Sequence, residues 1–137
     1  MSHEKVEIVS AVIAAFSRAE VDAALSYFTP NVERFAPPEW PEDRLYEGYD
    51  GLKKLASVWT ENFDNFELEL NRTIDAGDHV AVLLYQRGRI RRGSGEVEHR
   101  TAWDCELRGG MIARVSAYFS WEEALKAVGR REMSAYF

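Results

Sequence analysis

The chain lacks several features that identify particular classes of protein. It has one cysteine, Cys105, so no disulfide can form within it, and a single thiol suits a reducing compartment. No stretch reaches the roughly 18 uninterrupted apolar residues of a membrane span, and early charges at Glu4, Lys5 and Glu7 argue against a signal peptide. We therefore expect a cytoplasmic protein that has no membrane partner.

Excess positive charge is also missing. Lysine and arginine together number 17 against 23 acidic residues, which gives a formal net charge of −6 over 137 residues. An acidic chain is not attracted to phosphate backbones, so we expect no nucleic-acid partner. The three histidines show neither HxxxH nor HxH spacing, so we expect no metal site.

Apolar and aromatic residues are plentiful by comparison. Hydrophobic residues make up 46% of the chain, and there are 4 Trp, 7 Phe and 6 Tyr. This composition predicts one globular domain over residues 1–137, with large side chains facing a shared interior. No internal repeat or linker divides the chain.

The stretch from Glu96 to Ser120 organises the rest of the chain. It reads as two strands, 97–107 and 111–118, joined by a Gly-Gly hairpin turn. Side chains alternate between the faces of a strand, so Trp103 and Phe119 share one bulky, mostly apolar face. Such a face needs a cover, and we expect it to line a cavity.

The order of the elements predicts an α+β fold. Helical periodicity indicates helices at 4–18, 21–28 and 51–63, and a terminal helix capped at Ser120 and ending at Gly129. Alternation and turn signals indicate an early strand at 31–36, then four consecutive antiparallel strands at 66–74, 79–90, 97–107 and 111–118. A strongly curved sheet would leave a pocket between itself and the N-terminal helices.

Three segments carry a family resemblance. YEGYDGL opens the third helix, IDAGDHVAVLL enters a strand, and RGGMIARVSAYFSWEEAL closes the chain. Together with the element order, they resemble the SnoaL-like (polyketide cyclase-like) branch of the nuclear transport factor 2 superfamily over essentially the whole chain. The resemblance implies a cone-shaped barrel, in which the curved antiparallel sheet wraps around the N-terminal helices and a terminal helix follows.

The resemblance also implies a small-molecule pocket that needs no cofactor, and a homodimer. The dimer contact is expected on the outer sheet face, around Arg100, Ala102 and Asp104. The superfamily includes isomerases, cyclases, hydrolases, dehydratases and simple binding modules, so it predicts the fold better than the function.

The familiar catalytic carboxylates of the superfamily are missing. Ketosteroid isomerases and SnoaL-type cyclases carry an acidic residue on the penultimate strand, where this chain has Trp103. The base aspartate that ketosteroid isomerases place before a proline aligns with Ala36, and their first-helix tyrosine aligns with Val12 and Ile13. Proton transfer beside a carbonyl requires a base and a donor. A standard ketosteroid isomerase is therefore disfavoured, and a cyclase is less well supported.

The wall of the expected pocket is mostly aromatic. The expected lining residues are Trp103, Phe119, Trp59, Phe16, Phe28, Ala36, Tyr85 and Trp40. An aromatic wall suits an apolar or ring-containing ligand, and core filling is the alternative for each of these aromatic residues.

Two ionisable residues are the catalytic candidates. His99 has the parity of Trp103 and could act at the cavity mouth as a general base or carboxylate ligand; a plain edge histidine is the alternative. Arg34 has the parity of Ala36, and an arginine inside the pocket needs an anionic partner. That partner could be a ligand, or one of three acidic residues, Glu33, Asp104 and Glu106.

Two functions remain open from the sequence. The first is a cofactor-independent isomerase, cyclase, dehydratase or hydrolase that acts on an apolar or ring-containing metabolite. The second is a non-catalytic ligand-binding or protein-interaction domain. An enzyme needs at least one ionisable group with a shifted pKa in the cavity, whereas a binding pocket could be apolar throughout.

Overall fold

A computed structural model describes residues 2–37, 45–91, 93 and 95–134. Its helices are α1 (Ser2–Ser17), α2 (Val21–Leu25), α3 (Gly48–Asn62) and α4 (Trp121–Ser134). Its strands are β1 (Phe28–Phe35), β2 (Leu45–Glu47), β3 (Phe63–Ala76), β4 (His79–Ile90), β5 (Glu96–Arg108) and β6 (Met111–Tyr118). The predicted α+β class is confirmed. Among the described residues, no helix has both the length and the apolar composition that crossing a membrane requires.

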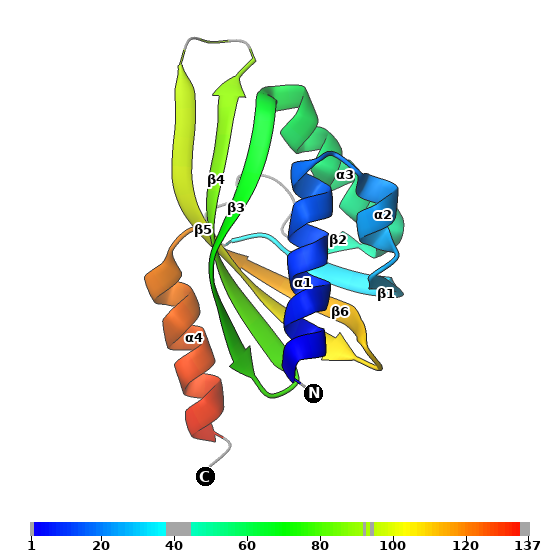
Figure 1. Ribbon diagram of the computed structural model, residues 1–137, viewed down its shortest axis with the longest axis vertical. Helices are drawn as coiled ribbons and strands as arrows, with labels where there is room; N and C mark the ends of the chain where they lie inside the picture. Colours follow the sequence, from blue (N-terminus) through cyan, green and yellow to red (C-terminus); the bar gives the residue numbers. More distant parts are fainter. Residues whose placement is uncertain (1, 38–44, 92, 94, 135–137) are drawn as a thin grey trace.

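The strands form one six-stranded sheet in the order β2-β1-β6-β5-β4-β3. Strands β3 to β6 are an antiparallel meander, as predicted, whereas β1 runs parallel to β6. Strands β2 and β3 are the two edges, so the curved sheet stays open rather than closing into a complete barrel. Figure 1 shows α1, α2 and α3 gathered on one side of the sheet and α4 away from them.

The central hairpin forms as the sequence predicted. Arg108 pairs with Met111, and the two residues between them, Gly109 and Gly110, have φ angles of 58° and 80°. Positive φ at both central positions is the requirement of a type I′ turn, which matches the right-handed twist of paired strands. Glycine reaches this region without steric cost.

Irregular pairing bends the sheet. The register shifts twice between β3 and β4, first between Asp64 and Glu67 and again between Leu70 and Arg72. Asn65, inside the first shift, has a φ of 54°. Such bulges increase the local twist and bend the strand. The long strands β3, β4 and β5 accordingly change direction part-way along their length (Figure 1).

The concave face of the sheet holds the main core. Inward residues of β1, β4, β5 and β6 pack against α1 and α3; Val9 on α1 and Leu52 on α3 are both buried. Helix α3 also approaches β2 closely, because a Cβ atom on Gly51 would lie 2.8 Å from the backbone carbon of Tyr46. The first turn of α3 is therefore held against the edge of the sheet.

Helix α4 packs on the convex face. Ala124 lies in a small apolar cluster with Leu83 and Ala102. The indole N–H of Trp121 donates to the backbone oxygens of Leu84 (3.1 Å) and Thr101 (2.9 Å), on two neighbouring strands. The outer face around Ala102, which was expected to contact a second subunit, is thus covered by the chain's own helix.

The cap of α4 is as predicted, but its end is not. The backbone N–H of Glu123 donates to the Ser120 hydroxyl at 3.3 Å. The helix does not stop at Gly129 and continues to Ser134. Gly129 is not among the glycines with positive φ, so it is not the left-handed residue that ends a helix.

Other boundaries also differ from the predictions. Residues 45–47, for which no strand was predicted, form β2 and pair with β1, and α3 begins at Gly48 instead of Gly51. Helix α2 stops at Leu25, and β1 begins at Phe28, so Pro30 lies inside a strand. Pro30 falls where the β1–β6 register shifts, between Phe28 and Glu33, which is where a strand tolerates a missing N–H.

We expect Trp121→Phe to loosen α4 from the sheet. Phenylalanine keeps a ring at this position but removes the N–H shared by two carbonyl oxygens. The free energy of unfolding should fall by about 1–2 kcal/mol, measured by denaturant titration. The control is Lys126→Gln on the same helix, which removes an exposed pair with Glu122 and should cost no more than about 0.5 kcal/mol. Equal effects from the two substitutions would contradict this role for Trp121.

Candidate functional site: an aromatic pocket with a buried arginine

A cavity of about 510 Å³ opens between α3 and the concave face of the sheet. Its inner end is made of buried residues: Arg34, Ala36, Leu55, Trp59, Thr101 and Ala117. Its mouth is lined by half-buried and exposed residues: Val58, Glu61, Asn62, Phe63, Gln86, Ile90, Arg91, Val97, His99 and Phe119. The size and the mainly apolar walls suit a small ring-containing molecule.

Stacked rings support the inner end of the pocket. Trp59 of α3 lies nearly parallel to Trp103 of β5, with ring centroids 6.4 Å apart and 9° between planes. Phe66 stacks on Trp59 at 5.0 Å, and Phe16 of α1 meets both tryptophans edge-on. Each such pair contributes about 0.5–1.5 kcal/mol beyond its area burial. The rings thus hold α1, α3 and the sheet in fixed relation beside the cavity.

Arg34 brings a positive charge to this aromatic region. Its guanidinium carbon lies 4.5 Å from the ring centroid of Trp103 and 5.7 Å from that of Trp59. The residue is only 6% exposed, and its Nε atom has no hydrogen-bond partner. Burial lowers the pKa of Arg34 to about 10, so it remains a cation at neutral pH. A cation–π contact is worth about 2 kcal/mol when desolvated, less than the several kcal/mol that burying an unpaired charge costs.

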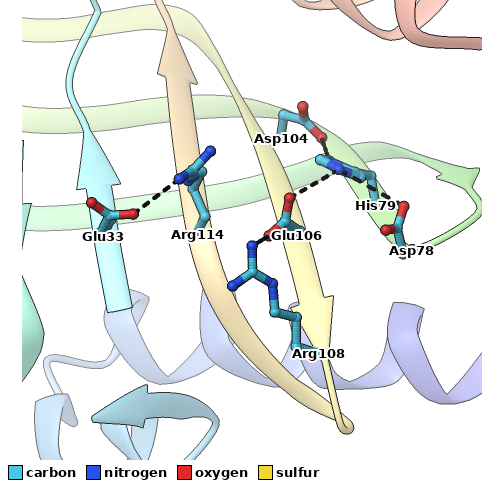
Figure 2. Close-up of polar contacts among 7 residues, drawn as sticks. All are labelled: Glu33, Asp78, His79, Asp104, Glu106, Arg108 and Arg114. Atoms are coloured by element: carbon cyan, nitrogen blue, oxygen red, sulfur yellow. Dashed lines mark hydrogen bonds and ion pairs between the residues drawn. The ribbon is translucent and has the colours of Figure 1, made fainter. Parts of the chain in front are cut away.

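None of the three acidic residues expected near Arg34 contacts it. Each lies on the outer face of the sheet and is engaged there (Figure 2). The pairs are Glu33 with Arg114 (3.0 Å), Asp104 with His79 (3.1 Å) and Glu106 with Arg108 (2.6 Å). Alternation explains this result, because Glu33 neighbours Arg34 in sequence and therefore points to the opposite face.

Cys105 could balance the charge of Arg34 only as a thiolate, but its thiol is protonated. It is a free, buried cysteine in the core, and burial raises the pKa of its thiol to about 12. The positive charge of Arg34 lowers the pKa of this thiol, but by less than burial raises it. At neutral pH the thiol therefore carries no charge, and it behaves as a small apolar residue.

His99 lies at the mouth of the cavity, on β5. Its ring meets that of Phe119 edge-on, with centroids 6.2 Å apart. Partial burial lowers the pKa of His99 below its usual value of 6.5, so the imidazole is neutral at physiological pH. A neutral imidazole beside an apolar cavity can accept a proton.

The structure places the expected pocket residues in different environments. Ala36, Trp59, Phe119, Arg34 and His99 line the cavity. Three other expected lining residues, Phe16, Phe28 and Trp103, belong to the packed core beside it. Trp40 lies outside the described residues.

Tyr85 is a correction to the expected lining. It lies on the convex face, where its ring contacts Trp121 at 5.1 Å. The central part of β4 is apolar on both sides because α4 covers the outer one, so hydrophobicity alone did not show which face Tyr85 occupies.

Some lining residues were not anticipated. Gln86 faces the cavity from β4, and Asn62 and Phe63 reach it from the junction of α3 and β3. Gln86 could have been found, since it is a polar residue two positions after the inward Leu84. Whether Asn62 and Phe63 line the cavity depends on the direction of α3 relative to the sheet. That direction is set by tertiary packing and cannot be predicted from the neighbouring sequence. No group of three or more His, Cys, Asp or Glu side chains in the described part of the chain could hold a metal ion.

Comparisons with known proteins agree with this architecture. Residues 9–115 match the model of the SnoaL-like domain. A Catenulispora acidiphila protein with a ketosteroid isomerase-like fold, in complex with trimethylamine, is similar with a TM-score of 0.74 and 20% identity over 90% of this chain and 92% of that one. A putative SnoaL-like polyketide cyclase from Jannaschia gives a TM-score of 0.77 and 15% identity over 93% of both chains.

TerC, co-crystallised with polyporic acid, gives a TM-score of 0.74 and 18% identity over 92% of this chain and 98% of that one. No curated protein sequence matches the chain. At these identities the similarity to solved structures establishes the fold alone.

The lowered pKa of His99 predicts a pH dependence of stability. As the pH falls, the His99 imidazole of the unfolded chain takes up a proton near its ordinary pKa of about 6.5. In the folded chain the same imidazole takes up its proton only at a lower pH. The contribution of His99 to the free energy of unfolding is therefore fully present above about pH 6.5, and it is lost as the pH falls through the folded-state pKa. Between about pH 7.5 and about pH 5, wild type should lose more unfolding free energy than His99→Gln does, as measured by denaturant titration. Carboxylates titrate in both proteins and cancel in the difference; parallel pH profiles would contradict the burial of His99.

Proposed function

Since this chain belongs to the SnoaL-like domain family, we propose that it is a small-molecule enzyme that works without a cofactor. Its reaction class is isomerisation, cyclisation, dehydration or hydrolysis, and its substrate is an apolar, ring-containing metabolite. One observation carries the proposal: a cavity of about 510 Å³ with mostly apolar walls has the neutral imidazole of His99 at its mouth.

His99 is the proposed proton acceptor. An apolar site keeps its imidazole uncharged and able to take a proton from a substrate carbon or from a water molecule. Families of this fold that use carboxylates place them at positions where this chain has Trp103 and Ala36. The base therefore has to come from another position, and His99 is the histidine that lines the pocket.

The second candidate function is a binding domain without catalysis. It is favoured by the location of His99 at the mouth instead of the inner end, and by the dense aromatic packing around Trp59. A binding domain requires the cavity but not the base, so the two functions can be separated by testing each feature.

We expect the pocket to bind a ring compound and His99 to abstract a proton from one. N-phenyl-1-naphthylamine, an uncharged fluorophore, should bind with increased emission. With 5-nitrobenzisoxazole, the base takes the ring C–H proton, the N–O bond breaks, and a nitrile and a coloured phenolate form. The rate with wild type should exceed that with His99→Gln by about tenfold or more, since positioned general bases contribute at least that much.

The matched control is His79→Gln, because His79 lies on the outer face of the sheet. It should keep both binding and rate. Fluorophore binding combined with equal rates in wild type and His99→Gln would favour the non-catalytic domain. Absence of fluorophore binding would reject both functions.

We also propose a cytoplasmic homodimer that pairs through the outer sheet face. The cytoplasmic location is supported by a lone, buried cysteine, which needs no oxidising compartment. Because α4 covers Ala102, the proposed contact lies further across the face, on β1 and β6. The Glu33–Arg114 pair lies there, with both side chains substantially exposed.

The expected mass in solution is twice the 15.7 kDa of one chain, measured by light scattering. Arg114→Glu would place like charges beside Glu33 and should shift the equilibrium toward single chains. Lys126→Gln, on α4, is the control and should leave the mass unchanged. A mass of one chain for wild type across the accessible concentrations would contradict the dimer.

A further inference from the structure

We infer that the ligand of this pocket is a ring compound that carries a carboxylate, and that Arg34 binds that carboxylate at the inner end of the cavity. The inference rests on the proposed function, since it names the chemical class of the molecule that the same cavity takes. It makes Arg34 an anchoring residue and leaves proton transfer to His99.

The first step is that Arg34 is a buried cation with which no acidic side chain among the described residues forms an ion pair. It is 6% exposed, lines the cavity, and its Nε atom lacks any hydrogen-bond partner. Its contacts with the rings of Trp59 and Trp103 offset only part of the cost of desolvation. A charge in this condition is stabilised most by an anion that enters from the cavity.

The second step is that the fold supplies no such anion from its described residues. Glu33, Asp104 and Glu106 lie on the opposite face of the sheet, each with its own basic partner (Figure 2). At the mouth, Glu61 is exposed to water and Arg91 is paired with Asp64. Water screens charges in such exposed positions. Among the residues that the structure describes, none therefore balances the positive charge at the inner end of the cavity.

The third step concerns the shape of the anion. A guanidinium group is a planar fork of N–H donors that matches the two oxygens of a carboxylate. The hydroxyl of Thr101, also at the inner end, donates to the backbone oxygen of Tyr118 at 2.9 Å and is already engaged. Arg34 is thus the side chain at this end that recognises the charged group.

The orientation of the ligand follows from these positions. A carboxylate on Arg34 places the ring of the ligand along the apolar walls and toward the mouth, where Phe119 and His99 lie. The charged end and the reacting end of the substrate are then recognised by different elements, β1 and β5. This separation lets one side chain hold the molecule while another moves the proton.

The test compares 2-naphthoate with 2-naphthamide, which share a ring system and differ in charge. Each competes for the cavity against bound N-phenyl-1-naphthylamine, and the displacement of its fluorescence gives the affinity. Wild type should bind 2-naphthoate about tenfold or more tightly than 2-naphthamide, since hydrogen bonds to charged groups are of that strength.

Arg34→Met keeps the length and apolar stem of the side chain but removes the charge. It should abolish the preference for 2-naphthoate and leave the affinity for 2-naphthamide unchanged. Arg34→Lys should keep part of the preference, because it retains the charge without the planar fork. Arg91→Gln tests the other cation that lines the cavity, and Arg108→Gln, on the outer face of the sheet, is the control that should keep the full preference.

The outcomes separate this inference from the proposed function. Displacement of the fluorophore by both compounds with equal affinity for wild type would overturn the carboxylate class and leave the pocket function standing. Failure of the fluorophore to bind would reject the pocket function, and the inference with it. Loss of the preference in Arg91→Gln but not in Arg34→Met would overturn the role of Arg34.

The unfolding temperature of the protein without added ligand shows whether Arg34→Met alters binding only because it destabilises the fold. Because no described acidic side chain pairs with Arg34, and its ring contacts offset only part of the desolvation cost, Arg34→Met should unfold at a temperature equal to or above that of wild type. An unfolded Arg34→Met chain would show that the cation is a structural requirement, and it would count against the inference. The comparison of the two naphthyl compounds on wild type needs no variant.

Discussion

The near-parallel contact between Trp59 and Trp103 fixes how closely α3 approaches the sheet. The rings lie 6.4 Å apart, and Phe16 of α1 closes on both from the edge, so three elements distant in sequence meet at one point. A packed aromatic set of this kind has few alternative arrangements, because each ring limits the rotamers of its neighbours. The cavity lies beside this contact, and Trp59 itself is part of its lining.

The same contact gives Trp103 a structural role on β5, at the core beside the cavity. Its indole is packed in the core, and the ring centroid lies 4.5 Å from the guanidinium carbon of Arg34. The charge that Arg34 brings to the inner end of the pocket is positive. A positive pocket favours acidic ligands, and the base that we propose, His99, is a neutral group at physiological pH.

Alternation in the sequence was sufficient to predict the central hairpin, the inward position of Trp103 and the fold class. It was insufficient where a strand is covered on both faces, as for Tyr85, because an apolar residue then gives no information about direction. The short strand Leu45–Glu47 was missed for a related reason: three residues at an edge carry too little pattern, and their pairing with β1 is a tertiary contact. Alternation alone excludes Glu33 as a partner of Arg34, whereas the positions of Asp104 and Glu106 relative to Arg34 depend on register across several strands.

Neighbouring residues on β1 show how the sheet separates its charges. Glu33 points outward and forms an ion pair with Arg114, whereas Arg34 points inward and forms none with the described acidic residues. If β1 served stability alone, an apolar residue at position 34 would pack against Trp103 with less desolvation cost. Groups that reduce stability locally, such as a buried charge without an ion pair, occur mainly at functional sites. The rest of the fold then supplies the stability that they cost. On the outer face Glu33, Asp104 and Glu106 each have a basic partner, whereas no described acidic side chain pairs with Arg34, which is why we propose that a ligand binds there.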